Sequence, residues 1–165
     1  MTSEHLLHTI PPIYDGNSKI LILGSFPSVK SREVSFYYGH PQNRFWRVLA
    51  AVFGCAVPSS NEEKTALLQS HNIALWDVIK SCDIVGSSDS SIKNVVPNDI
   101  GTILSSCGIR QIYSNGKTSE KLFNKYIKDT VGRDTVALPS TSPANASYNL
   151  ERLTDSWSVI KNNIR

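Results

Sequence analysis

The residues best suited to bind a ligand or take part in a reaction lie between positions 24 and 46, in the stretch GSFPSVKSREVSFYYGHPQNRFW. Gly24 has no Cβ atom, so the backbone there can come close to a ligand. Phe36, Tyr37 and Tyr38 offer flat faces on which an unstacked base can lie. Asn43 stands near a predicted helix start, where free backbone N–H groups favour anions. The stretch therefore predicts a site for a flat, polar ligand.

Each of these residues also has a simpler interpretation. Three consecutive aromatic residues usually include at least one that packs in the core. Asn43 can bond to the backbone of its own helix start, and a single histidine such as His40 is more often structural than catalytic. Single residues therefore do not identify the chemistry. It has to be identified from the pattern of residues along the whole chain.

The elements that must position these residues follow an α/β pattern. Four short β-rich runs, at residues 19–24, 73–78, 110–114 and 134–138, alternate with stretches of helical spacing. The helical stretches are residues 45–53 with Pro41 in the first turn, 60–68 with a capping box of Ser60 and Glu63, 122–127 and 150–160. This order predicts one domain over residues 1–165, a three-layer α/β/α fold around a central, mostly parallel four-stranded sheet. In such sheets the site lies at the carboxyl ends of the strands.

The composition fits a folded protein and restricts its class. Of the 165 residues, 40% are hydrophobic and 19% are charged, which is enough to form a core. A formal net charge of +3 permits an anionic partner without requiring one.

Neither a signal peptide nor a bilayer-spanning apolar run is evident. We therefore expect no membrane association, and a cytoplasmic, nucleoid-associated location in a prokaryote or a nuclear one in a eukaryote. Cys55, Cys82 and Cys107 are widely spaced and odd in number, so we expect neither a disulfide framework nor a cysteine zinc site. No residue pattern in the chain implies another metal or an organic cofactor.

Two motifs resemble those of the uracil-DNA glycosylase superfamily. The first joins GSFPS to YYGHPQNRFW and is similar to a G-x-N-P-G turn followed by a HP-x-N-x-FW helix start. The matching residues are Gly24, Pro27, His40, Pro41, Asn43, Phe45 and Trp46. The second, LPSTSPANASYNLERL at residues 138–153, is similar to the superfamily's minor-groove wedge loop and closing helix. The resemblance covers nearly the whole chain and implies a uracil-DNA glycosylase-like fold.

One residue departs from the pattern of the mismatch-specific uracil/thymine glycosylases. Those enzymes place a water-orienting asparagine inside the first turn, where this chain has Phe26. The hypoxanthine-DNA (deoxyinosine) glycosylase branch shows the same loss and relies on the asparagine at the helix start, which is Asn43 here. The departure therefore makes the resemblance closest to the deoxyinosine branch.

The resemblance implies base-excision repair of double-stranded DNA. A deaminated base would leave the stack, its N-glycosidic bond would be hydrolysed, and an abasic site would remain. Pro143, Ala144 and Asn145 would insert from the minor groove, while Ser140 and Ser142 would hold flanking phosphates. No obligate protein partner is expected. Neither Lys30 nor Lys117 is marked as an amine nucleophile, so base removal without lyase activity is expected.

The base pocket would be built from the first motif, with Gly24 and Pro27 in its wall. Tyr38 would stack on the extruded base, and Phe26 would form part of the pocket floor. The backbone N–H groups of Ser25 and Phe26 would bond the base carbonyl as negative charge develops there. Asn43 would position the attacking water through its amide oxygen, because an amide is too weak a base to deprotonate water.

Asp77 ends the second β-rich run and has two interpretations. It falls where other superfamily members keep an asparagine that reads the base edge, and a carboxylate there can accept the ring N–H of hypoxanthine or uracil. It can equally anchor the turn that follows. Asp89 is open in the same way.

Rival functions remain at this point. The same fold could act on uracil, on xanthine, or on thymine opposite guanine, and only Phe26 favours hypoxanthine. A non-catalytic nucleic-acid-binding module would also explain the aromatic and basic residues. No G-x-G-x-x-G or phosphate-loop lysine motif supports that reading, and the absence of a nucleophile elbow argues against an acyl hydrolase.

Overall fold

The computed structural model describes residues 2–165, and its central sheet is the predicted one. The four strands are β2 (Ile20–Gly24), β3 (Ile73–Asp77), β6 (Gln111–Asn115) and β7 (Thr135–Leu138). They lie in the order β3-β2-β6-β7, and every neighbouring pair is parallel. Each strand falls within one residue of its predicted bounds, which confirms the sheet. The order reverses between β2 and β6, where ligands bind in open α/β sheets.

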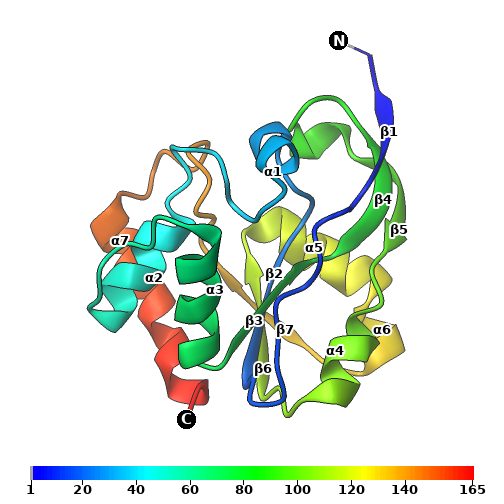
Figure 1. Cartoon of the computed structure of the whole chain (residues 1–165). Coiled ribbons are helices and arrows are strands. Elements are labelled where there is room, and N and C mark those ends of the chain that lie inside the picture. Colours follow the sequence, from blue (N-terminus) through cyan, green and yellow to red (C-terminus); the bar gives the residue numbers. More distant parts are fainter. Residues whose placement is uncertain (1) are drawn as a thin grey trace.

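Helices cover both faces of this sheet, as Figure 1 shows. All five residues of β2 are buried. Ile20 and Ile22 pack in one core cluster with α2 (Phe45–Phe53), α3 (Asn61–Ser70) and α7 (Leu150–Trp157). Leu21 and Leu23 pack in the other with α4 (Ile100–Ser106) and α5 (Lys117–Tyr126). Burial on both faces explains the continuous apolar run in β2 and confirms the three-layer prediction.

A second, antiparallel sheet was not predicted. It consists of β1 (Glu4–Leu7), β4 (Ile79–Ile84) and β5 (Lys93–Pro97), in the order β1-β4-β5. The β4–β5 register shifts twice, and most of β1 is exposed. None of the three strands therefore shows a regular alternation of buried and exposed residues. A short 3-10 helix, η1 (Asp89–Ser91), lies between β4 and β5. This sheet brings the N-terminal segment to the edge of the central sheet.

The helix starts are partly as predicted. Ser60 accepts a hydrogen bond from the Glu63 backbone N–H, which confirms one half of the capping box predicted for α3. The Glu63 carboxylate accepts from the hydroxyl groups of Ser59 and Ser60 and not from the Ser60 backbone N–H. Helix α2 begins only at Phe45, with Arg44 as its N-cap residue, so the placement of Pro41 in its first turn was wrong. The remaining helices are α1 (Val29–Val34), α6 (Lys128–Val131) and η2 (Ser158–Asn163). Within residues 2–165 no helix is long and apolar enough to cross a membrane.

Candidate active site

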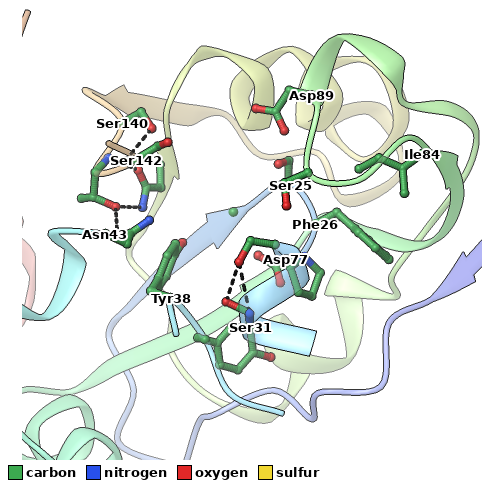
Figure 2. A pocket seen from close by; sticks show the side chains of 17 residues that line it. Ser25, Phe26, Ser31, Tyr38, Asn43, Asp77, Ile84, Asp89, Ser140 and Ser142 are labelled. Carbon is green, nitrogen blue, oxygen red and sulfur yellow. Dashed lines mark hydrogen bonds between the residues drawn. The ribbon is translucent and has the colours of Figure 1, made fainter. Parts of the chain in front are cut away.

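A pocket opens at the carboxyl ends of β2, β3 and β6, where the strand order reverses. Its cavity volume is about 170 Å³, slightly more than the roughly 150 Å³ that holds a benzene molecule in an engineered cavity. The lining combines the loop after β2, the ends of β3 and β6, the segment from the end of β4 to η1, and the loop after β7. It includes Gly24, Ser25, Phe26, Pro27, Tyr38, Asn43, Asp77, Asp89, Asn115, Ser140, Thr141 and Ser142. Figure 2 shows Asn43 on the same side as Ser140 and Ser142, with Phe26 and Ile84 opposite. All seven residues predicted for catalysis and base binding thus line one pocket.

Asp77 is held at the bottom of this pocket by a residue that the sequence did not reveal. Its Oδ2 atom lies 2.7 Å from Nε2 of His8, and the two side chains are only 5% and 1% exposed. The Oδ1 atom lies over Gly24, where a Cβ atom would overlap it. Asp77 therefore does not use its carboxylate to anchor the following turn; that turn is held by Asn98, which donates to the backbone carbonyl of Asp77.

Tyr38 presents an aromatic ring and a hydroxyl group to the pocket. Its ring stacks on Phe45 with centroids 4.1 Å apart, so only its other face can meet a ligand. Its hydroxyl group is buried and has no hydrogen-bond partner in the described structure. Burial, and then the charge of Asp77, raise the pKa of Tyr38 far above its usual value, so the phenol keeps its proton. Tyr38 also has a positive φ of 53°, an uncommon conformation that concentrates at functional sites.

Asn43 is fixed by a chain of three polar side chains. The Asn115 side chain accepts from the Thr141 backbone N–H (3.0 Å) and donates to Thr141 Oγ1 (3.0 Å). Thr141 Oγ1 in turn donates to Asn43 Oδ1 at 2.9 Å. Asn43 Oδ1 also accepts from the Phe45 backbone N–H at 3.0 Å, so the oxygen cannot exchange places with the amide nitrogen. This relay joins the ends of β6 and β7 to the start of α2.

The relay changes the role predicted for Asn43. An amide oxygen has two lone pairs, and both already accept hydrogen bonds here. The oxygen therefore cannot also hold a water molecule unless the Thr141 hydroxyl turns away. The amide N–H groups of Asn43 donate no hydrogen bond within residues 2–165, so they are the atoms available to a ligand.

The loop after β2 supplies the predicted backbone donors. Val78 and Ile79 donate to the carbonyls of Gly24 and Ser25, which fixes the loop against β3. The N–H groups of Ser25 and Phe26 donate no hydrogen bond elsewhere in the described chain. Two neighbouring free amides beside a carboxylate can bond a carbonyl oxygen while the carboxylate accepts an N–H group.

The predicted wedge loop, residues 139–149, is held by Arg44. The Arg44 guanidinium group donates to the carbonyls of Ser142 (2.8 Å), Asn145 (3.1 Å) and Tyr148. Pro143 and Ala144 are exposed at the tip of the loop. Asn145 instead uses its amide group to donate to the Ser140 carbonyl, so it shapes the loop from within.

Replacing Arg44 by Met should loosen this loop. The substitution removes all three donors, whereas the flexible ammonium group of Arg44→Lys cannot reproduce the planar fork. We expect faster amide hydrogen exchange across residues 140–149 in both variants, with the central strands unchanged. Arg133→Met is the matched control, since it removes one hydrogen bond to a carbonyl at Ile109, outside the pocket lining. Unchanged exchange in the Arg44 variants would contradict this role.

Ser140 and Ser142 keep donors that can meet a phosphate. Each hydroxyl oxygen accepts a backbone N–H, Ser140 from Ser142 (3.1 Å) and Ser142 from Ala144 (3.2 Å). Their O–H groups are not used by these bonds and belong to the pocket lining. Phosphate contact by these residues stays a prediction.

A second carboxylate, Asp89, stands across the pocket from the Asn43 side in Figure 2. Burial raises the pKa of its carboxyl group, and the neighbouring side chains of Thr118 and Ser25 partly offset the rise. Asp89 belongs to η1, in the serine-rich segment at residues 86–91, whose sequence has no helix or strand pattern. The pocket thus contains two acidic groups in different surroundings, one beside His8 and one beside hydroxyl groups.

The chain is similar to known proteins over nearly its whole length. The sequence model of the uracil DNA glycosylase superfamily matches residues 11–162. A hypoxanthine DNA glycosylase of Methanosarcina barkeri is 36% identical over 137 residues, which are 82% of this chain and 85% of the relative. A hypoxanthine DNA glycosylase of Methanosarcina acetivorans is 34% identical over 152 residues, 91% of this chain and 94% of the relative. The solution NMR structure of a candidate uracil DNA glycosylase from Methanosarcina acetivorans matches with a TM-score of 0.78 and 33% identity, covering 92% of this chain and 94% of that one.

Proposed function

The chain belongs to the uracil DNA glycosylase superfamily, and from this we propose that it removes hypoxanthine from deaminated DNA. It is a DNA glycosylase, a hydrolase whose substrate is DNA. The choice of hypoxanthine is supported by the names of the two relatives and by Phe26 in place of the asparagine of the mismatch enzymes.

The observation that carries the proposal is that Asp77 and the free backbone amides of Ser25 and Phe26 lie in the lining of one pocket. Hypoxanthine presents a carbonyl oxygen next to a ring N–H group. In the proposed complex Asp77 Oδ1 accepts the N–H group, and the two backbone N–H groups donate to the carbonyl oxygen. Tyr38 covers the base with its free face. Adenine carries an amino group and an unprotonated ring nitrogen on the same edge, so it offers the opposite pattern.

The reaction follows from this arrangement. The C1′–N9 bond breaks with its electron pair left on the base, and the amides of Ser25 and Phe26 stabilise the charge that spreads to the carbonyl oxygen. Water adds to C1′ of the cationic sugar, and the proton that it loses neutralises the departing base. Asn43 holds this water through an amide N–H group, which leaves one lone pair of the water to face C1′.

The substrate is tested with labelled duplexes that carry a single deoxyinosine, deoxyuridine or deoxyxanthosine. The purified protein is incubated with each in the presence of a chelator, and alkali then cleaves any abasic product. We expect strand cleavage at deoxyinosine, with much less at deoxyuridine. Cleavage only at deoxyuridine would keep the glycosylase and overturn hypoxanthine as its substrate.

The relay through Thr141 should affect the rate without binding the base itself. Thr141→Val removes the hydroxyl that orients Asn43, and we expect base excision to slow about tenfold, which corresponds to one hydrogen bond of about 1.4 kcal/mol. Thr141→Ser keeps the hydroxyl and should restore most of the rate. Single-turnover assays on a deoxyinosine duplex measure this, and equal rates for the two variants would rule out orientation by the hydroxyl.

A further inference from the structure

His8 is placed next to the pocket residue Asp77 by the second sheet. It follows β1 directly, and its backbone N–H donates to the Lys80 carbonyl at 2.7 Å, which continues the β1–β4 pairing by one residue. From there Nε2 reaches Asp77 Oδ2, in a contact from which water is almost excluded. A carboxylate can only accept, so the imidazole N–H donates.

The imidazole ring has little freedom to leave Asp77. It is surrounded by Phe26, Tyr37 and Trp76, whose ring centroids lie 6.1, 6.1 and 6.5 Å from its own. The hydroxyl group of Tyr37 donates to the Pro11 carbonyl at 2.8 Å and ties down the segment that follows His8. Tyr37 therefore restrains both the His8 ring and the backbone that follows it.

We propose that His8 is a positioning residue that holds the Asp77 carboxylate with Oδ1 toward the base edge and thereby sets the specificity for bases with a ring N–H. This inference rests on the proposed base-binding role of Asp77. By engaging Oδ2, His8 aims Oδ1 over Gly24 at the place where the base edge lies in the proposed complex. It also provides the hydrogen bond that a buried carboxylate needs.

Without His8, Asp77 Oδ2 would lose its hydrogen bond, and the carboxylate could turn about its Cβ–Cγ bond. Oδ1 would then no longer be held over Gly24, where the ring N–H of hypoxanthine or uracil lies in the proposed complex. Adenine has an unprotonated ring nitrogen on this edge, and a carboxylate oxygen cannot donate to it. A site built to bond one pattern rejects the other strongly, because its buried polar groups are then left unpaired. His8 thus separates damaged bases from adenine without touching either.

Two substitutions distinguish positioning from packing. His8→Leu fills the space among the three aromatic rings but cannot donate, whereas His8→Gln keeps an N–H donor at a similar reach. In single-turnover assays on the deoxyinosine duplex, we expect His8→Leu to lose about 100-fold in rate and His8→Gln to stay within about fivefold of the unsubstituted protein. Circular dichroism checks that both are folded. Near-normal rates in His8→Leu, or equal losses in two folded variants, would overturn the proposal.

A modified substrate tests the same inference without altering the protein. A duplex with 1-methyldeoxyinosine replaces the ring N–H by a methyl group, and we expect the unsubstituted enzyme to excise this base at least about 100-fold more slowly. Equal excision of both bases would overturn the inference even if His8→Leu does not fold. If the enzyme acts on deoxyuridine and not on deoxyinosine, the proposed substrate fails. The His8 comparison then runs on deoxyuridine and 3-methyldeoxyuridine, where it still decides the role of His8.

Discussion

Replacing Asn43 by Ala is expected to lower the rate of base excision by about 100- to 1,000-fold, the usual loss when one preorganised donor is removed. The variant also loses two hydrogen bonds accepted by Oδ1, from Phe45 and Thr141, so a drop in the free energy of unfolding of roughly 1–2 kcal/mol should accompany it. Single-turnover kinetics on a deoxyinosine duplex measure the rate, and affinity for the same duplex serves as the control. Affinity should stay close to that of the unsubstituted enzyme.

Asn43→Asp shows which atom of the side chain is used. A carboxylate keeps oxygen acceptors for Phe45 and Thr141 and has no N–H donor. If Asn43 holds the water through its amide N–H groups, this variant should be about as slow as Asn43→Ala. A fully active Asn43→Asp enzyme would instead mean that the oxygen holds the water, after the Thr141 hydroxyl has turned away.

Gly24→Ala is the second substitution with a large expected effect. A Cβ atom at this position would overlap Asp77 Oδ1 and would lie 3.0 Å from the Tyr38 hydroxyl oxygen. Because His8 and the surrounding rings hold Asp77, the carboxylate cannot simply move aside. We expect kcat/KM to fall about 100-fold, the loss that a displacement of about 1 Å can cause at a reacting site.

The control for this variant is Gly16→Ala. A Cβ atom at Gly16 meets nothing within 4 Å, so activity and stability should be nearly unchanged. If Gly24→Ala is as active as Gly16→Ala, the base cannot bind between Asp77 and Tyr38 in the way proposed here. A folded Gly24→Ala protein that binds abasic DNA normally would place the defect in the base pocket.

The central sheet could be predicted because its signal is local and strong. A parallel strand buried on both faces must be apolar throughout, and ILILG at residues 20–24 meets this condition whatever its neighbours are. The site could be located for a related reason: Asn43, Asp77 and Ser140 stand at the carboxyl ends of the strands or in the loops that follow, and the motif order brings them to one pocket.

The residues that hold the site could not be predicted, since their roles depend on contacts between distant segments. His8 follows a mostly exposed strand, and nothing near it in sequence indicates a partner 69 residues away. The sequence does not distinguish Thr141 from other polar loop residues, because its role depends on hydrogen bonds to the distant residues Asn115 and Asn43. Arg44 stands next to a predicted helix start, and nothing in the sequence indicates that its guanidinium group binds three carbonyls of its own chain.

The proposed substrate and the role of Asp77 are tested most directly by the identity of the base released from one duplex that contains both deoxyinosine and deoxyuridine. Mass spectrometry of the small-molecule fraction at short times reports which of the two bases the enzyme releases faster. We expect free hypoxanthine to appear first, and we expect Asp77→Ala, which removes the acceptor of the ring N–H, to abolish its release. Release of uracil alone, or hypoxanthine release that is unchanged in Asp77→Ala, would contradict the proposed base recognition.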